Sequence, residues 1–234
     1  MATQTSDYLG AIEHLPVGGE LVLTDVSWES YEQLLTELGD SCGLRISYDQ
    51  GRMEIMSASQ EHEEYKEFIS RLVYVIAEEL LVEVEGLGST AFKQQWLERG
   101  VEPDACFYVQ NARIAIEKRI DLRTDPPPDV VVEIDVSRDS RSKLSIYQGM
   151  KVPEVWLYDE SRMLFLHLSN DCYVEKASSL AFPLITSEAL TTFLERSKTE
   201  GQTTVARTFR KWIHELTSKQ NLNDASTNAQ RTEQ

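Results

Sequence analysis

Basic residues are scarce in this 234-residue sequence. It contains 23 Lys and Arg against 39 Asp and Glu, which gives a net charge of −16. A chain this acidic is not expected to bind nucleic acid through an overall positive surface, as histone-like or coat-like proteins do, although a local nucleic-acid site is compatible with the charge. The hydrophobic share of 41% and the charged share of 26% are ordinary for a globular protein, so we expect a folded body.

Cysteine pairs and long apolar segments are also missing. The three cysteines are far apart and form no CxxC motif, which fits a reducing compartment better than a disulfide framework. Residues 1–10 contain no basic residue and no apolar core of a signal peptide, and the longest apolar run of the first long helix is only Leu72 to Ala77. We therefore expect a cytoplasmic protein that does not enter a membrane.

Several common catalytic motifs are absent. The sequence has no HExxH, no Cys/His spacing of a closed zinc site, and no GxxxxGK, GxSxG or GxGxxG. These absences argue against zinc proteolysis, P-loop nucleotide hydrolysis, serine hydrolysis and dinucleotide redox chemistry.

Hydrophobic periodicity predicts an ordered series of helices and strands. Apolar residues at helical spacing predict an amphipathic helix over 27–39, and a longer one over 59–84 with a capping Ser59. Between them, 44–57 alternates around a turn at 49–51 and predicts a β-hairpin. The long helix should lie against a sheet.

The second half of the sequence predicts the central strands. Strand-like segments span 89–97, 102–109 and 129–136, and the last is apolar on both faces, as in a covered central strand. A helix over 139–150 and further strands follow, and the predicted domain organisation has four parts. These are an N-terminal arm at 1–26, a main domain at 27–190, a helical extension at 191–218 and a disordered polar tail at 219–234.

Two carboxylates and a lysine form the informative pattern. Asp104 starts one predicted strand, Glu133 lies within the next, and Lys143 follows in a helix. Hydrolysis of a phosphodiester needs charge neutralisation, a hydroxide at neutral pH and a stabilised leaving oxygen, and carboxylate-held divalent ions supply all three. Mg²⁺ prefers one or two carboxylates, and a nearby lysine can orient water and help to deprotonate it, because desolvation lowers the pKa of an ammonium group.

The sequence resembles the PD-(D/E)XK nuclease superfamily, and within it the Uma-type restriction endonuclease family. The resemblance rests on EPDACFYV at 102–109, on PPDVVVEIDVSRDSRSKLSIYQGMKVPEVWLYD at 127–159, and on MSASQEHEE at 56–64, where His62 stands at the usual histidine position. It implies that Asp104 and Glu133 are metal ligands, with the Ile134 carbonyl as a third, and that Lys143 is the catalytic lysine. The sequence departs from the simplest E-x-K pattern at Asp135, which either adds a ligand or weakens the site.

Each of these residues also has a structural interpretation. Asp104 could simply form a Pro-Asp turn at the start of a strand. Glu133 could form a buried ion pair with Arg138 or Arg141. Lys143 could be a solvated residue on the surface of its helix. His62 could be a residue that bonds locally at the start of a helix or lines the cleft. Tyr147, one turn after Lys143, could serve in packing, with a hydroxyl that orients a neighbouring side chain.

A basic segment lies near the C-terminus. Between 196 and 219 there are six basic residues and two acids, and an apolar stripe runs along the segment at helical spacing. The segment fits a DNA-backbone contact, or equally a packing or homodimer helix.

The prediction from sequence is therefore an α/β fold, with a restriction-endonuclease-like mixed central sheet flanked by helices on both faces. The predicted activity is a DNA endonuclease dependent on Mg²⁺ or Mn²⁺ that uses Asp104, Glu133 and Lys143, with His62, Asp135 and Tyr147 as accessory residues. The alternative is a non-catalytic binding or assembly module with the same fold and a degraded metal site.

Overall fold

The computed structural model describes residues 5–39, 43–135 and 140–232. In chain order the elements are α1 (Thr5–Ile12), β1 (Glu20–Leu23), α2 (Trp28–Leu38), β2 (Leu44–Asp49), β3 (Arg52–Ser57), α3 (Gln60–Leu80), β4 (Glu85–Gly86), β5 (Phe92–Gln94), η2 (Gln95–Leu97), β6 (Arg99–Val101), β7 (Ala105–Tyr108), α4 (Ala112–Glu117), β8 (Val130–Ile134), η3 (Ser140–Lys143), α5 (Leu144–Gly149), β9 (Glu154–Tyr158), β10 (Met163–Ser169), β11 (Cys172–Lys176), α6 (Ser187–Glu200) and α7 (Gln202–Thr232).

Strands β7, β8 and β9 form the centre of a six-stranded mixed sheet, ordered β11-β10-β9-β8-β7-β4. Strand β8 pairs antiparallel with β7 and parallel with β9. All five residues of β8 are buried, as the apolar sequence of this strand predicts. The prediction of a mixed central sheet is confirmed.

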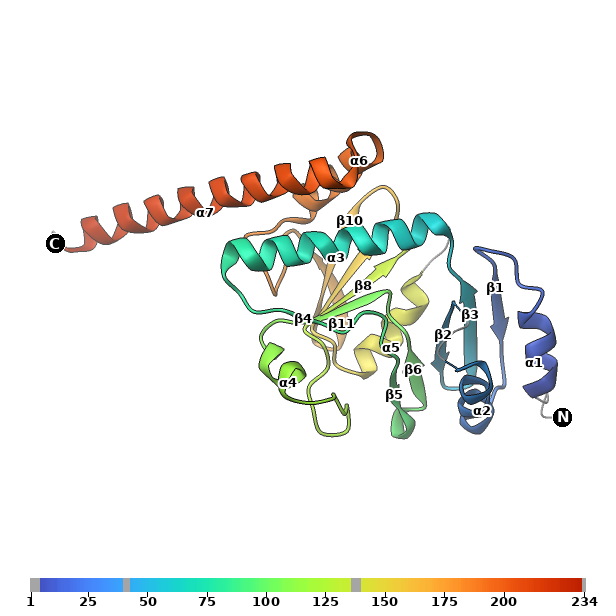
Figure 1. Cartoon of the computed structure of the whole chain (residues 1–234). Coiled ribbons are helices and arrows are strands. Elements are labelled where there is room, and N and C mark those ends of the chain that lie inside the picture. Colours follow the sequence, from blue (N-terminus) through green and yellow to red (C-terminus); the bar gives the residue numbers. More distant parts are fainter. Residues whose placement is uncertain (1–4, 40–42, 136–139, 233–234) are drawn as a thin grey trace.

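Helices cover both faces of this sheet. Val130, Val132 and Ile134 of β8 pack with α3, α6 and α7 in one apolar cluster, whereas Val131 packs with α5 in another. Figure 1 shows α3 lying across the sheet with α7 beside it. Because successive side chains of a strand point to opposite faces, one strand supplies both clusters.

A second sheet lies on the N-terminal side of the molecule (Figure 1) and was not expected from the sequence. It is antiparallel throughout and ordered β1-β3-β2-β6-β5. The predicted hairpin at 44–57 is confirmed as β2 and β3, whose turn at Gln50 and Gly51 has two positive φ angles, as a two-residue hairpin turn requires.

The boundaries of some elements differ from the expected ones. Helix α3 ends at Leu80 rather than near residue 84, because Leu81 adopts a left-handed conformation that stops the helix. The segment 1–26, expected to be an arm, contributes α1 and β1, and β1 pairs with β3. Helix α7 extends to Thr232 and so includes most of 219–234, which was expected to be a disordered tail, because an anchored helix propagates readily through residues without Gly or Pro.

The basic C-terminal segment is used largely for packing. Val205, Phe209 and Ile213 of α7 are buried against α3 and α6. Arg210 pairs with Glu78 and Glu79 of α3. Within the described part of the chain, no helix is both long and apolar enough to cross a membrane.

Candidate active site

Asp104 and Glu133 lie opposite each other on neighbouring strands. The register pairs Ala105 with Val132 and Cys106 with Val131, and its continuation by one residue sets Asp104 against Glu133. Directly opposite residues share a face, here the α5 face of the sheet, so the two side chains point to the same side. The side chain of Asp104 is 0% exposed and that of Glu133 is 1% exposed.

Glu133 is held by two side chains that follow β8. Nζ of Lys143 lies 2.6 Å from Oε2 of Glu133, and the hydroxyl of Tyr147 donates a hydrogen bond to Oε1. Burial and the charge of Asp104 raise the pKa of Glu133 to about 7, although Lys143 and the hydrogen bonds oppose this shift. Arg138 and the side chain of Arg141, the expected structural partners, lie outside the described residues.

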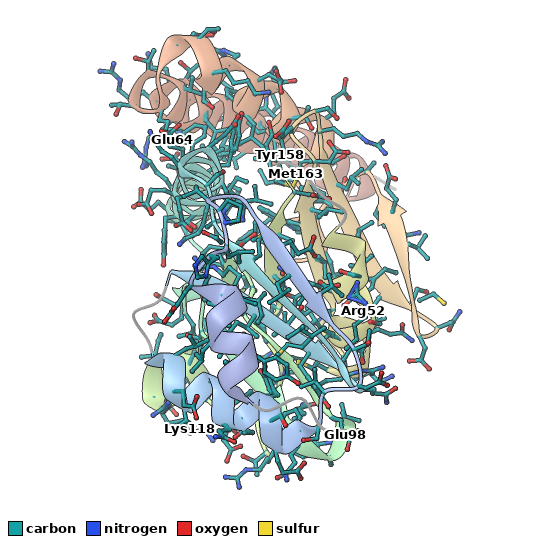
Figure 2. All side chains as sticks on the ribbon, turned by 90° about the vertical axis from the view of Figure 1, so that its right-hand side faces the viewer. Arg52, Glu64, Glu98, Lys118, Tyr158 and Met163 are labelled. Atoms are coloured by element: carbon teal, nitrogen blue, oxygen red, sulfur yellow. The ribbon has the colours of Figure 1, made fainter. Side chains whose placement is uncertain are left out.

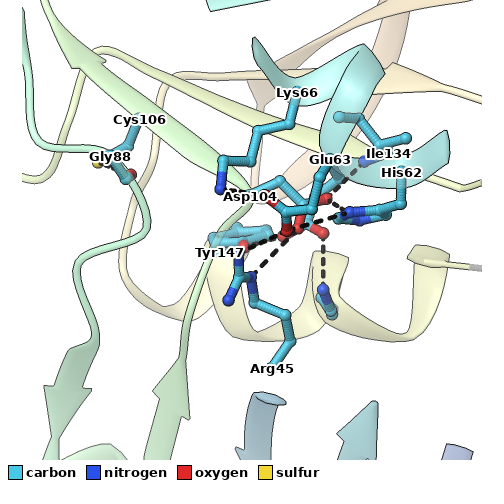
Figure 3. A network of polar contacts seen from close by, with 11 residues as sticks. Arg45, His62, Glu63, Lys66, Gly88, Asp104, Cys106, Ile134 and Tyr147 are labelled. Atoms are coloured by element: carbon cyan, nitrogen blue, oxygen red, sulfur yellow. Dashed lines mark hydrogen bonds and ion pairs between the residues drawn. The ribbon is translucent and has the colours of Figure 1, made fainter. Parts of the chain in front are cut away.

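Asp104 has three neighbours from three different elements, drawn in Figure 3. Its Oδ2 accepts a hydrogen bond of 2.8 Å from the N–H of Ile134 and lies 3.0 Å from Nε2 of His62. Its Oδ1 lies 3.7 Å from Nε of Arg45. Burial alone raises the pKa of Asp104, but the hydrogen bond from His62, the charges of Lys143 and His62 and the Ile134 N–H hold it below its usual range.

Two opposing effects act on the pKa of Lys143. Burial on its own lowers the pKa of this ammonium, which is the effect that the sequence suggested. The nearby carboxylates of Glu133 and Asp104 outweigh it and raise the pKa above its ordinary value. The pKa of Lys143 is thus set by its carboxylate neighbours more than by burial.

His62 and Tyr147 both lie at the predicted cluster. His62 is in the first turn of α3, where its N–H is capped by Ser59, and its ring is buried. Tyr147 is fully buried on α5, four residues after Lys143, so both reach the same carboxylate. The structure thus brings together five residues, namely His62 of α3, Asp104 directly before β7, Glu133 of β8, Lys143 of η3 and Tyr147 of α5.

Ile134 and Asp135 contact the surrounding sheet through their backbones. The N–H of Ile134 bonds to Asp104, and the N–H of Asp135 donates a 2.7 Å hydrogen bond to the carbonyl of Tyr158. Asp135 follows the last residue of β8 and is partly buried. The ligand role of the Ile134 carbonyl and the effect of Asp135 on the site stay predictions.

Arg45 and Glu63 belong to the same network but were not singled out from the sequence. Nη2 of Arg45 lies 3.0 Å from Oε1 of Glu63, and Lys66 lies 2.6 Å from Oε2 of Glu63 (Figure 3). Arg45 belongs to the other sheet, so its approach to Asp104 depends on how the two sheets pack. The available signal was a basic residue within an alternating, half-buried strand.

The donor set fits a magnesium ion. Asp104 Oδ1 is buried and has no hydrogen-bond partner among the described residues. Each oxygen of a carboxylate can accept two partners, so Glu133 retains acceptor capacity beside Lys143 and Tyr147. Within the described ranges no three His, Cys, Asp or Glu side chains are arranged to hold a metal, but Mg²⁺ commonly uses one or two carboxylates with water.

Comparison with known proteins gives one family match. The family model Uma2, described as "Putative restriction endonuclease", matches residues 28–194, which is more than half of the chain. Among solved structures, a "putative nuclease belonging to DUF820" from Anabaena variabilis ATCC 29413 aligns with 72% of this chain and 99% of its own, at 15% identity and a TM-score of 0.49. No curated protein matches the sequence.

Proposed function

The chain belongs to the Uma2 restriction endonuclease family, and from this premise we propose that it is a Mg²⁺-dependent DNA endonuclease acting through Asp104, Glu133 and Lys143. The observation that carries the proposal is the pair of buried carboxylates on adjacent strands with a lysine 2.6 Å from one of them. A carboxylate in a central apolar strand is costly unless it is paired or binds a cation; Glu133 is paired with Lys143, and cation binding is the further role proposed for the two carboxylates.

In this proposal Asp104, Glu133 and the Ile134 carbonyl hold the metal. Bound Mg²⁺ or Mn²⁺ supplies Lewis acidity toward a phosphoryl oxygen and lowers the pKa of a bound water. Lys143 places a positive charge next to the carboxylates, where it orients water and offsets negative charge that develops on the phosphoryl oxygens. The ion pair between Lys143 and Glu133 supports this electrostatic role.

The surrounding residues keep the carboxylates in place. Lys143 and Tyr147 donate to Glu133, while the Ile134 N–H donates to Asp104 and Nε2 of His62 lies 3.0 Å from it, so each carboxylate is contacted from two sides. Accelerations by enzymes require about 8–23 kcal/mol of barrier lowering, which a single carboxylate does not supply. The cluster is therefore proposed to act as a unit.

Cleavage assays test this assignment. The wild-type chain and the Asp104→Asn and Lys143→Gln variants are incubated with plasmid DNA and Mg²⁺ or Mn²⁺, and Asp171→Asn, an exposed acid far from the site, is the matched control. We expect cleavage by the wild type and the control only, while circular dichroism shows all four folded. Equal cleavage by all four proteins would contradict the site. Parallel single-stranded, branched and RNA substrates define the substrate form.

One observation favours the alternative of a non-catalytic module. Both oxygens of Glu133 are already engaged, one by Lys143 and the other by Tyr147. A binding module needs no metal, whereas the proposed nuclease does. Calorimetric titration with Mn²⁺ distinguishes them, because absence of binding at millimolar metal, together with absence of cleavage, supports the module.

A further inference from the structure

Two adjoining depressions border the candidate site. One, of about 580 Å³, lies between α2, β2 and the segment before β5, and Arg45 is part of its wall. The other, of about 700 Å³, lies between the same segment and the loop after α4. Their linings share four residues, namely Thr90, Ala91, Lys93 and Arg119. The two depressions are thus continuous, and we call them together the Arg119 groove.

Arg45 lies between the groove and the carboxylate of Asp104. Arg45 lines the groove, and its Nε lies 3.7 Å from Oδ1 of Asp104. These two atoms are buried and lack hydrogen-bond partners among the described residues. They face each other as an ion pair, so Arg45 is the side chain that links the groove to the carboxylate of Asp104.

Basic side chains outnumber acidic ones in the lining of the groove. Its charged lining comprises four basic side chains, Arg45, Lys93, Lys118 and Arg119, and two acidic ones, Glu102 and Asp121. Asp121 is neutralised by Arg123, whose Nη2 lies 2.6 Å away. Arg45 in turn pairs with Glu63, so the charge that the lining offers to an anion depends mainly on Arg119.

Arg119 stands out among these basic residues. Lys93 pairs with Glu32, and Lys118, labelled in Figure 2 at the end of the molecule opposite Glu64, pairs with Asp125. Arg119 is exposed and forms no hydrogen bond or ion pair with any residue of the described ranges. An arginine in a groove whose charge is not offset by a carboxylate is well placed to bind an anion such as a phosphate.

From these observations we infer that the Arg119 groove binds the sugar-phosphate backbone of an extended, unpaired nucleic-acid strand and leads it to the candidate site. Arg119 and Lys93 contact phosphates along the groove, and Arg45 contacts the phosphate nearest Asp104. This inference rests on the proposed nuclease function and adds the substrate form. An extended strand fits because Asp104 and Glu133 are almost fully buried, so a duplex has to open locally before one of its phosphates reaches them.

Binding measurements test the groove separately from cleavage. Fluorescence anisotropy of a labelled single-stranded oligonucleotide is recorded with Ca²⁺ in place of Mg²⁺, over a series of salt concentrations. Arg119→Gln is compared with Arg113→Gln, an arginine of α4 that is 89% exposed and outside the groove. We expect Arg119→Gln to raise Kd and to reduce the slope of log K against log salt by about 0.7, the value for one phosphate of a single strand.

Three results would overturn the inference. The first is an unchanged Kd and salt slope for Arg119→Gln. The second is an equal loss of affinity in Arg113→Gln. The third is that the wild type binds the matching duplex more tightly, or binds neither oligonucleotide. The cleavage assay separates this failure from that of the proposed function. If Asp104→Asn abolishes cleavage but Arg119→Gln leaves binding unchanged, the groove is wrong and the nuclease stands. If no protein cleaves but Arg119→Gln weakens binding, the groove stands and the proposed nuclease activity is wrong.

Discussion

Lys143 and Glu133 form a buried ion pair that joins the segment after β8 to β8 itself, with Nζ 2.6 Å from Oε2. Neither residue is more than slightly exposed. A buried pair of this kind is weak evidence for stability, because the desolvation of both charges opposes their attraction. Removal of one partner is different, since it leaves the other charge buried alone.

Lys143→Met is therefore expected to lower the free energy of unfolding by about 3 kcal/mol in the metal-free protein. Lys151→Met, which removes one partner of an exposed pair with Asp171, should cost less than about 1 kcal/mol. Urea unfolding measures both. The double variant Glu133→Gln, Lys143→Met should lose less than Lys143→Met alone, and a larger loss in the double variant contradicts the ion pair.

Tyr147→Phe should reduce cleavage through kcat rather than KM. The change removes the hydroxyl that donates to Glu133, so the carboxylate is less well oriented while substrate contacts persist. Stability should fall by about 1–3 kcal/mol because a buried hydrogen bond is lost. Tyr173→Phe makes the same chemical change at a bond to the Val152 carbonyl, away from the site, and should leave kcat unaltered. Steady-state kinetics on a cleaved oligonucleotide provide the measurement.

Glu154→Gln should destabilise the fold by about 3 kcal/mol, although this residue lies outside the candidate site. The buried carboxylate of Glu154 accepts hydrogen bonds from the Ser179 hydroxyl and from the N–H groups of Leu180 and Ala181, and so fixes that loop to β9. The exposed Glu175→Gln is the matched control and should change stability by less than about 0.5 kcal/mol. Hydrogen exchange at the Leu180 and Ala181 amides should accelerate only in the Glu154 variant.

Asp159→Asn should show a stability loss that depends on pH. Burial raises the pKa of Asp159, but the Ser161 hydroxyl and the N–H groups of Arg162 and Ser161 outweigh it and hold the pKa below its usual value. A carboxyl with a lowered folded-state pKa stabilises the fold above its unfolded pKa of about 3.9, and this stabilisation is lost as the pH falls through the folded value. Unfolding at a series of pH values should show the variant and wild type converging in acid. A difference that is constant with pH would refute this account.

Local patterns predicted much of the fold. The apolar spacing of α3 and the alternating hairpin of β2 and β3 are short-range signals, and both elements were found close to their expected limits. The two carboxylates and the lysine were proposed from a motif, and the register of β7 and β8, continued by one residue, sets Asp104 against Glu133.

Contacts between residues far apart in the chain could not be predicted from the sequence. Arg45 reaches Asp104 only because the five-stranded sheet packs beside the six-stranded one, and no local pattern encodes that contact. The raised pKa of Lys143 likewise depends on two carboxylates from different strands. Burial alone was visible in the sequence, and it suggested a shift in the opposite direction.

The opposition of Asp104 and Glu133 across β7 and β8 has a consequence for how this family can diversify. The two carboxylates are aligned by the backbone ladder, and a slip of one residue between these strands moves one of them to the other face of the sheet. The walls of the Arg119 groove come mainly from the segments before β5 and after α4, which lie outside that ladder. Insertions in those segments would alter the shape of the groove without shifting the ladder, so the form of the groove and the alignment of the two carboxylates are free to vary independently.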